Sequence, residues 1–214
     1  MRSILMYHSI DPSGSPISVS AEQFRRHVRW LASGRVRVLD VAGLLADRDE
    51  GDAVALTFDD ALASFGDIAW PLLRDAGLPV SLFVPTAHVG GSNAWNPAAL
   101  GIPSLPLMGW EALARAAEEG VELAAHTRSH PSLPRLSRGA LEDEILGGTE
   151  QLQRETGRRA AGFAYPFGEW SPAVLEVVRL RFQWACTTEL RPLGRVSDPC
   201  LLPRIDAYYL REAG

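Results

Sequence analysis

The chain has 214 residues, of which 46% are hydrophobic and 22% are charged, and its formal net charge is −5. This length favours a single domain, 1–214, and this composition excludes intrinsic disorder, collagen and a disulfide-rich scaffold. The acidic balance argues against a nucleic-acid partner, and no apolar run approaches the roughly 20 residues of a transmembrane helix.

Short β-rich segments alternate with amphipathic helical segments along the chain. Taken in order, the expected elements are a strand at Ile4–Tyr7, a helix opened by the capping box Ser20–Gln23, strands at Val36–Leu39 and Ala53–Phe58, a helix at Trp70–Ala76, a strand at Val80–Val84, a helix at Trp110–Glu119, a strand at Val121–Ala125, a helix at Leu136–Thr156, a strand at Phe163–Tyr165, a helix at Pro172–Arg179 and a strand at Trp184–Thr187. The long segment Thr86–Pro106 has several glycines and prolines. Such a segment is typical of a functional loop at the rim of a binding site.

Strands that alternate with helices predict βαβ units and a parallel sheet. At least six such repeats in one domain favour a closed or nearly closed (β/α) barrel, and an open doubly wound sheet is the alternative. In a parallel barrel the active site lies at the carboxyl ends of the strands. The side chains that follow each expected strand are therefore the first candidates for function.

Three of the expected strands end directly in residues suited to metal binding or hydrolysis. Asp59 and Asp60 follow one strand, His126 follows another, and Tyr165–Gly168 ends a third. An Asp pair in such a place is by itself more typical of a turn or a helix N-cap. The coincidence at three strand ends favours one shared site.

His126 and His130 lie four positions apart, a spacing that would point both imidazoles the same way on a helix. Two surface histidines in a loop are the alternative. The chain has only five histidines, and this pair is expected opposite two carboxylates. Two imidazoles and one carboxylate form a metal site with open positions for water and substrate, and we favour that interpretation.

Five segments of the chain resemble those of one family. Leu56-Thr57-Phe58-Asp59-Asp60 and His126-Thr127-Arg128-Ser129-His130-Pro131 are similar to the first two motifs of the polysaccharide deacetylase (NodB-homology) family of carbohydrate esterases. Phe163-Ala164-Tyr165-Pro166-Phe167-Gly168 is similar to its third motif, in the Tyr-Pro-x-Gly variant. Met6-Tyr7-His8-Ser9-Ile10 and Leu202-Pro203-Arg204-Ile205 resemble the same variant branch. The resemblance implies an α/β fold, a distorted (β/α) barrel of about seven parallel strands.

The resemblance also implies a role for each matching residue. Asp60, His126 and His130 would hold one divalent metal, usually zinc, and Asp59 would be the general base. The third motif would line the acetyl pocket, with the backbone N–H of Phe167 helping to hold the oxyanion. This set suits amide hydrolysis, because a Lewis acid polarises the carbonyl and activates water, while a carboxylate beside it can take the proton of that water.

Three features depart from the common family pattern. Ala61 replaces the glycine that usually follows the Asp pair, at slight expected cost. Ala164 stands where the common third motif has an arginine that orients the base, and Arg204 on the last strand could reach the same place. The usual C-terminal histidine acid has no counterpart, because no histidine follows His130. The variant branch resembles a circular permutation that supplies this acid from the N-terminus, so His8 is the expected general acid, placed across the metal site from Asp59 without binding the ion.

The candidate substrate-binding residues are Tyr165, Pro166, Phe167, Arg204 and Trp184. Trp184 also fits the core, since it lies on a late strand, although the family often has a pocket tryptophan there. Trp95 in the long loop is expected either to stack on a sugar or to anchor the loop, and Trp170 could flank the acetyl group or the sugar. His27 and His88 are expected to have no catalytic role.

Together these features predict a metal-dependent N-deacetylase that acts on an N-acetylated sugar or glycan. An amidase on a non-sugar amide would use the same metal site, and a carbohydrate-binding domain of the same fold is the non-catalytic alternative. The N-terminus of the given chain lacks a secretory h-region, so we expect a cytoplasmic protein with a nucleotide-linked, lipid-linked or short glycan as substrate. Cys186 and Cys200 are expected as free buried thiols, with a disulfide as the alternative.

Overall fold

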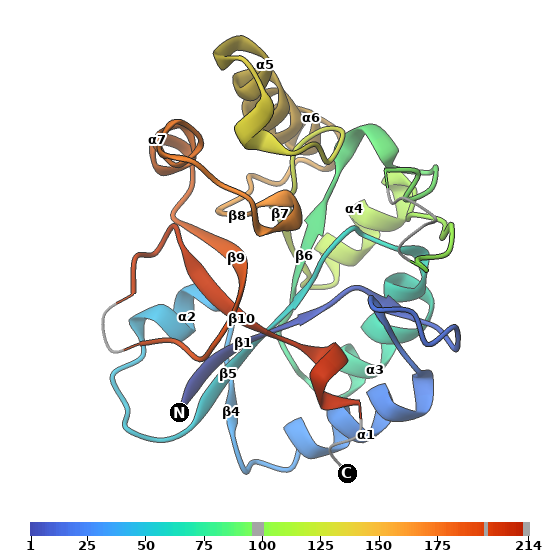
Figure 1. The fold of residues 1–214 in the computed structure, drawn as a ribbon. Coiled ribbons are helices and arrows are strands. Elements are labelled where there is room, and N and C mark those ends of the chain that lie inside the picture. The colour runs from blue at the N-terminus through green and yellow to red at the C-terminus, as the bar shows by residue number, and fades with distance from the viewer. Residues whose placement is uncertain (96–100, 195–196, 212–214) are drawn as a thin grey trace.

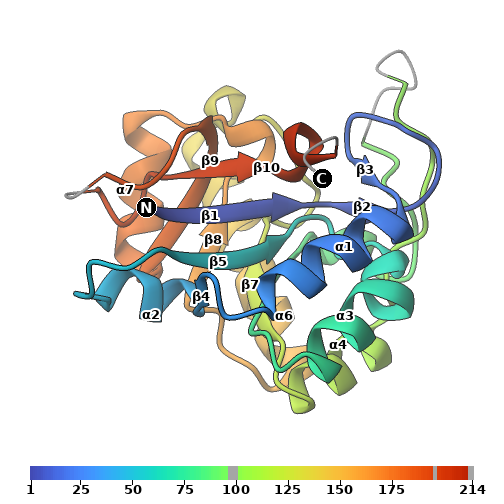
Figure 2. The ribbon, with the colours of Figure 1, turned by 90° about the horizontal axis from the view of Figure 1, so that it is seen from below.

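The fold is a barrel of parallel strands. The computed structural model describes residues 1–95, 101–194 and 197–211. The strands of its main sheet are β1 (Arg2–Tyr7), β4 (Arg37–Val38), β5 (Ala53–Phe58), β6 (Ser81–Val84), β7 (Glu122–Ala125), β8 (Gly162–Ala164), β9 (Trp184–Leu190) and β10 (Leu202–Asp206). Seven of them follow one another in the order β1-β10-β9-β8-β7-β6-β5, and the ring closes because β5 also pairs with β1. Figure 2 shows β10, β1 and β5 side by side. The prediction of a seven-stranded parallel barrel is confirmed, and the open-sheet alternative is wrong.

The strand β4 lies outside this ring. It pairs with Ala53 and Val54 at the start of β5, whereas β6 pairs with Thr57 and Phe58 at the end of β5. All six residues of β5 are buried. A strand buried on both faces needs an unbroken apolar run, and the sequence of β5 supplies one except at Thr57. A small second sheet of β2 (Ser9–Ile10) and β3 (Ser18–Val19) follows β1 and was not expected from the sequence.

Helices surround the barrel (Figure 1). They are α1 (Ala21–Leu31), α2 (Val41–Ala46), α3 (Trp70–Asp75), α4 (Trp110–Glu118), α5 (Arg138–Glu142), α6 (Gly148–Thr156) and α7 (Pro172–Arg181). The capping box of α1 is confirmed, because the Ser20 hydroxyl accepts from the Gln23 N–H while the Gln23 side chain accepts from the Ser20 N–H. The sequence analysis missed α2, whose six residues are too few to show a helical period. Among the described residues, no helix is long and apolar enough to cross a membrane.

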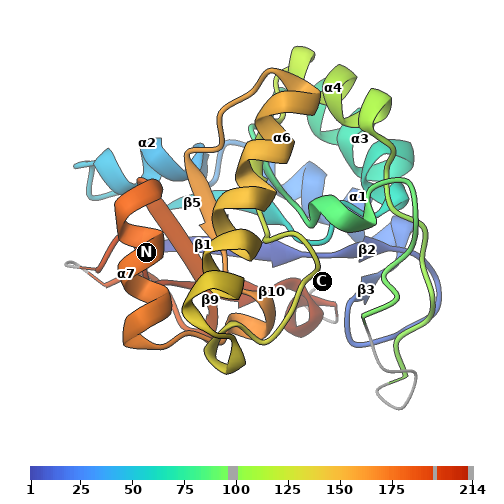
Figure 3. The ribbon, with the colours of Figure 1, turned by 90° about the horizontal axis from the view of Figure 1, so that it is seen from above.

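The long helix expected at Leu136–Thr156 differs from the prediction in two ways. It begins later, at Arg138 after the N-cap Ser137, and it is interrupted between α5 and α6 by a π-helical turn at Asp143–Gly147. Figure 3 shows α5 and α6 as one column along the outside of the barrel. Such π turns are frequent at functional sites. In this one, the side chain of Glu144 contacts the segment His126–Pro131, the second of the three family motifs.

The barrel interior is filled by alternate residues of each strand. The inward-facing core residues include Ile4, Ala55, Phe83, Ala124, Ala164, Trp184, Cys186 and Leu202. Because side chains alternate along a strand, the same alternation brings Thr57 and Asp59, Arg204 and Asp206, and His8 to the carboxyl-terminal mouth of the barrel. A separate apolar cluster fills the space between the strands and the surrounding helices.

Candidate active site

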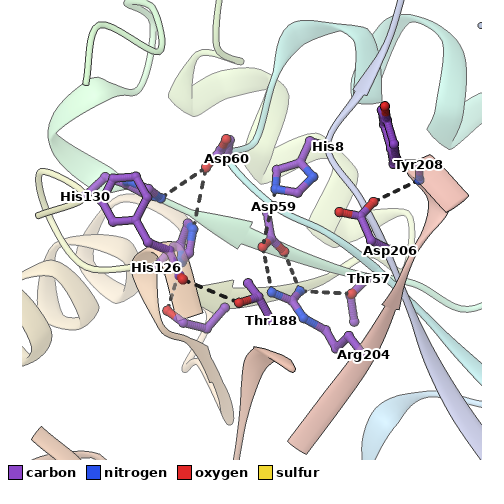
Figure 4. A network of polar contacts seen from close by, with 12 residues as sticks. His8, Thr57, Asp59, Asp60, His126, His130, Thr188, Arg204, Asp206 and Tyr208 are labelled. Atoms are coloured by element: carbon purple, nitrogen blue, oxygen red, sulfur yellow. Dashed lines mark hydrogen bonds and ion pairs between the residues drawn. The ribbon is translucent and has the colours of Figure 1, made fainter. Parts of the chain in front are cut away.

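A buried ion pair forms the floor of the site. Arg204 donates from Nη1 to Oδ1 of Asp59 over 2.6 Å and from Nη2 to Oδ2 over 2.7 Å, and both residues are buried. Its remaining donors reach the carbonyl of Thr187 at 2.9 Å and the hydroxyl of Thr57 at 3.2 Å. Burial alone would raise the pKa of Asp59, but the charge and hydrogen bonds of Arg204 outweigh burial and hold this pKa well below its ordinary value. Asp59 is therefore a fixed carboxylate with a defined orientation (Figure 4).

Three potential metal ligands meet beside this pair. Oδ1 of Asp60 lies 3.5 Å from Nε2 of His126 and 3.6 Å from Nε2 of His130, and all three residues are buried. Each residue offers one ligand atom, and these atoms lie within 4.8 Å of one another. Among the described residues, no hydrogen-bond donor partners Oδ1 of Asp60. A buried carboxylate oxygen that faces two imidazole nitrogens without a hydrogen bond fits a divalent ion at their centre.

His126 is oriented for this role by a hydrogen bond to the backbone. Its Nδ1 lies 2.8 Å from the carbonyl oxygen of Ala164, so Nδ1 carries the proton and donates it. The lone pair is then on Nε2, the atom that faces Asp60. Metal-binding histidines are commonly held by such an acceptor behind the ring.

His130 is held differently, by aromatic rings. The indole of Trp95 stacks on it with a centroid distance of 4.9 Å, and the ring of Phe167 meets it edge-on at 4.7 Å. Among the described residues, Nδ1 of His130 has no hydrogen-bond partner. Burial lowers the pKa of His130 to about 3, so this imidazole is neutral at pH 7 and has a lone pair available on one ring nitrogen. Trp95 thus anchors the loop and the histidine together, the second of its two expected roles.

Among the described residues, every non-glycine residue with a positive φ lies in one of the three motif loops. The non-glycine residues with positive φ are Asp60 (70°), Ala61 (48°), Thr127 (64°), His130 (59°) and Phe167 (59°). Left-handed backbone is unfavourable for residues with a Cβ, and it concentrates at functional sites where the surroundings enforce it. His126 and His130 do not share a helical face, because this segment is a loop with two left-handed residues, and the loop brings both rings to Asp60.

The histidine loop is fixed in turn by the π-helical turn between α5 and α6. Glu144 accepts hydrogen bonds from the N–H groups of Arg128 and Ser129 at 3.0 and 2.9 Å, and from the Ser129 hydroxyl at 2.6 Å. The helix approaches so closely that a Cβ at Gly148 would lie 2.8 Å from the carbonyl carbon of Thr127. Sequence reasoning missed Glu144, and no local signal marks it, since its partners lie 15 and 16 residues away.

His8 reaches the site from the end of β1. Its Nε2 lies 3.8 Å from Oδ2 of Asp59, and its side chain is 17% exposed. His8 therefore lies beside Asp59. The expectation that it lies across the metal site from Asp59 is wrong. Among the described residues, the group of potential metal ligands does not include His8.

These residues open into a cavity of about 290 Å³. Its lining includes His8, Asp59, Asp60, His130, Tyr165, Phe167, Thr188 and Asp206. Phe167 is 47% exposed, whereas Tyr165 contributes only part of its ring, because its hydroxyl donates to the carbonyl of Cys200 at 2.8 Å. Pro166 is buried and is not among the lining residues. Asp206, which sequence reasoning missed, follows from the same strand alternation that places Arg204.

Two expected substrate-binding residues have other roles. Arg204 is 0% exposed and donates hydrogen bonds to Asp59, Thr57 and Thr187. It therefore positions the Asp59 carboxylate and does not face the cavity. Trp184 points into the barrel, but it lies at the first residue of β9, two inward positions below Thr188 at the mouth. There its ring packs against Phe83 and leaves room only for a glycine at position 162, where a Cβ would lie 2.2 Å away.

The remaining histidines and the cysteines are not among the potential metal ligands of the described residues, although the ring of His88 packs against Trp95 with a centroid distance of 4.5 Å. His27 bonds to the Tyr7 hydroxyl at 3.1 Å, and His88 lies 3.3 Å from the carbonyl of Ser129. Cys186 and Cys200 are free and buried, which confirms the thiol prediction.

Several known proteins are similar to this chain. Residues 46–181, more than half of the chain, match the family model described as polysaccharide deacetylase. The YxkH protein of Bacillus subtilis is 24% identical over 208 residues, covering 94% of this chain and 70% of that protein. The poly-β-1,6-N-acetyl-D-glucosamine N-deacetylase of Staphylococcus epidermidis is 21% identical over 202 residues, covering 88% of this chain and 67% of that protein. The structure of IcaB from Ammonifex degensii, which is 22% identical, has the same fold with a TM-score of 0.83 and covers 97% of this chain and 94% of that one.

Proposed function

This chain belongs to the polysaccharide deacetylase family, and on that premise we propose that it is a metal-dependent hydrolase that removes N-acetyl groups from amino sugars of a glycan. One observation carries the proposal. The potential metal ligands Asp60, His126 and His130 lie directly beside a second carboxylate, Asp59, which Arg204 holds ionised and oriented. A site that only bound sugar would have no use for a base fixed next to a metal.

The donor set suits zinc. Two neutral imidazole nitrogens and one carboxylate oxygen are ligands that zinc takes in hydrolytic sites, with an open position for water or substrate. When bound, such an ion polarises the acetyl carbonyl and lowers the pKa of water from 15.7 to about 7. We assign Asp60, His126 and His130 as its ligands.

The protein's own residues would perform the proton transfers. Asp59 accepts the proton of the attacking water, and Arg204 keeps both of its carboxylate oxygens in place while it does so. His8, 3.8 Å from Asp59, donates a proton to the departing amine, because an amide anion is too basic to leave. The backbone N–H of Phe167, set by its left-handed conformation, helps to hold the oxyanion.

The charge of the cavity favours a neutral or cationic glycan. Three carboxylates, Asp59, Asp60 and Asp206, are among its lining residues, and among the described residues no arginine lines it. Recognition of phosphate usually needs arginine or lysine, and this chain has no lysine at all. The relative from Staphylococcus epidermidis is named for poly-β-1,6-N-acetyl-D-glucosamine, which is neutral. We therefore favour an uncharged N-acetylated glycan over a nucleotide-linked sugar.

Acetate release tests this proposal. The zinc-loaded protein should release acetate from N-acetylglucosamine oligomers, lose the activity in a chelator and regain it when zinc is restored. Metal content, measured in parallel, should follow the activity. Acetate release that persists in a protein shown to be metal-free would contradict the metal assignment. Hydrolysis of simple acetamides without any action on the oligomers would favour the non-sugar amidase.

A further inference from the structure

The long segment Thr86–Pro106 folds back on itself at a neck, formed by residues 91–93 and 105–107. In the neck, the Asn93 N–H donates to the carbonyl of Leu105 over 3.1 Å, and the Leu107 N–H donates to the carbonyl of Gly91 over 3.0 Å. Antiparallel strands pair in the same way. The neck therefore holds two stretches of chain side by side although they are some ten residues apart in sequence.

The neck connects the loops of two potential metal ligands. On one side, the carbonyl of Ala61, the residue after Asp60, accepts from the N–H of Met108 just beyond the neck over 2.9 Å. On the other side, Trp95 stacks on His130. Figure 4 shows Asp60 and His130 facing each other across the candidate metal site. A change in the neck would thus be felt at both ligands.

One buried side chain fastens the neck. Asn93 is 1% exposed, its Oδ1 accepts from the Leu105 N–H over 2.7 Å, and its Nδ2 donates to the carbonyl of Pro103 over 3.1 Å. These partners fix the orientation of the carboxamide, because an N–H can only donate and a carbonyl can only accept. A buried amide is costly unless it is paired, and here both of its halves are paired. The Pro103 bond also fixes the chain next to Ile102, which lines the catalytic cavity.

Trp95 has no comparable bond of its own. Its ring lies between those of His88 and His130, at centroid distances of 4.5 and 4.9 Å. Among the described residues, its buried indole N–H has no hydrogen-bond partner. Ring contacts tolerate small shifts, so the position of the indole depends on the backbone that carries it. That backbone leaves the neck at Asn93, only two residues before.

We propose that Asn93 is a positioning residue of the metal site: its carboxamide closes the neck and thereby keeps Trp95 stacked on His130. Asn93 itself is neither a potential metal ligand nor a lining residue of the catalytic cavity. This inference rests on the metal assignment of the proposed function and deepens it. It makes the affinity for the ion depend on an amide that touches none of the assigned ligands.

The position of Trp95 can be measured directly in the metal-free protein by NMR of the imidazole protons. An indole stacked on His130 shifts the His130 signals through its ring current, and Trp95→Ala shows where these signals lie without the ring. Asn93→Leu, similar in shape but unable to form either hydrogen bond, should move them most of the way to the Trp95→Ala position. Signals that stay at the wild-type position in Asn93→Leu would overturn the proposal.

Zinc affinity tests whether Asn93 acts through Trp95. Asn93→Leu should lower the affinity by roughly tenfold, as expected for loss of an outer partner of a ligand, and Trp95→Ala should do the same. The double variant should also lose only about tenfold, because the second change removes nothing that the first has left in place. A hundredfold loss in the double variant, or an unchanged affinity in Asn93→Leu, would overturn the proposal.

The helix α1 offers two matched controls. Gln23 is another side-chain amide that joins distant segments, since its Nε2 donates to the carbonyl of Arg211 over 2.7 Å. Trp30 is 49% exposed and lies outside the catalytic cavity. Gln23→Leu and Trp30→Ala should leave the His130 signals and the zinc affinity unchanged. If Gln23→Leu moved the His130 signals as far as Asn93→Leu, general loosening of the fold would explain the result and the proposal would fail.

A milder variant covers the case in which Asn93→Leu does not fold. Asn93→Asp keeps the acceptor for the Leu105 N–H and loses only the donor to Pro103. It should change the His130 signals and the zinc affinity in the same direction by a smaller amount, and no change in either would overturn the proposal. If the wild type binds no zinc, the metal assignment fails. The His130 signals then decide alone whether Asn93 holds Trp95, for which they must move in the variant.

Discussion

Asp59 and His130 line the same cavity, yet their surroundings differ. Asp59, with its neighbours His8, Thr57 and Arg204, forms a strand side, in which charge-assisted hydrogen bonds come from the barrel interior. His130, with Trp95 and Phe167, forms a loop side, in which aromatic packing and left-handed backbone fix the ring. Hydrogen bonds to a buried charge are strong and directional, whereas ring contacts contribute about 0.5–1.5 kcal/mol each and tolerate small shifts.

This difference indicates which side of the cavity can tolerate amino-acid substitutions. On the strand side, neither Asp59 nor Arg204 can be lost without leaving the other as a buried, unpaired charge. The loop side can exchange one ring for another and adjust the cavity without rebuilding the barrel, as loops on rigid scaffolds commonly do. Substitutions on the strand side should therefore have large effects, and those on the loop side smaller ones.

The largest effect is expected on the strand side, for Asp59→Asn. Without the base, turnover should fall by about 10²- to 10⁴-fold, the usual contribution of general-base catalysis. Bound metal should remain near the wild-type level, because Asp59 is not one of the three assigned ligands. Asp60→Asn is the matched comparison and should lose metal instead. Loss of metal from Asp59→Asn and its retention in Asp60→Asn would show that the two roles are reversed.

The second prediction concerns the stability that the buried pair provides. Arg204→Met leaves the Asp59 carboxylate buried and unpaired, which should lower the free energy of unfolding by about 3–5 kcal/mol at pH 7. Urea unfolding measures this. In the double variant with Asp59→Asn, no unpaired charge remains, so the combined loss should be well below the sum of the two single losses. Additive losses would mean that the two side chains do not depend on each other.

The pH dependence of this stability difference gives a further test of the buried pair. The pKa of Asp59 is lower in the folded protein than its ordinary value of 3.8, so the pair contributes its full stability above about pH 4. That contribution is lost as the pH falls from this value through the lower folded pKa. In Arg204→Met, burial raises the pKa of Asp59 above its ordinary value, so the difference between wild type and this variant should begin to shrink above pH 4 and shrink further below it. A constant difference from pH 7 to pH 2 would mean that another group carries it.

The third prediction asks whether His8, also on the strand side, acts as the acid. His8→Ala should reduce turnover of an N-acetyl sugar by about 10²-fold, since the amine must be protonated as it leaves. An activated acetyl ester, whose leaving group needs no proton, should be hydrolysed nearly as fast as by wild type. Equal losses on both substrates would assign His8 a structural role through its contact with Asp59.

The smallest effect is expected on the loop side. Trp95→Ala removes the stacked ring from His130, and metal affinity should fall by roughly tenfold, the lower end of what is found when an outer partner of a ligand is lost. Trp95→Phe should restore most of it, which a nonspecific loss of folding would not allow. Competition with a metal-sensitive dye measures the affinity, with Trp30→Ala as control. An affinity equal to that of wild type would show that the loop backbone alone orients His130.

Much of the fold follows from local sequence. The run Ala53–Phe58, which is apolar except at Thr57, became β5 with the expected bounds, and the capping box of α1 formed as expected, because both depend on neighbours close along the chain. The polar residues at strand ends could be grouped from the sequence, since parallel strands deliver their carboxyl ends to one edge. Asp59, Asp60, His126 and His130 do lie together there.

The tertiary structure decided how these residues are held and which of them face the substrate. Arg204 lies 145 residues from Asp59, and only closure of the barrel between β1, β5 and β10 turns both side chains into the same interior. Strand alternation gives Trp184 its inward direction, but its depth below the mouth depends on the register between strands, which the sequence of one strand does not contain. The sequence by itself thus determined which chemical groups reach the mouth of the barrel, because alternation and strand ends are local. Their partners, depth and strain depended on contacts between distant segments, which form only when the barrel closes.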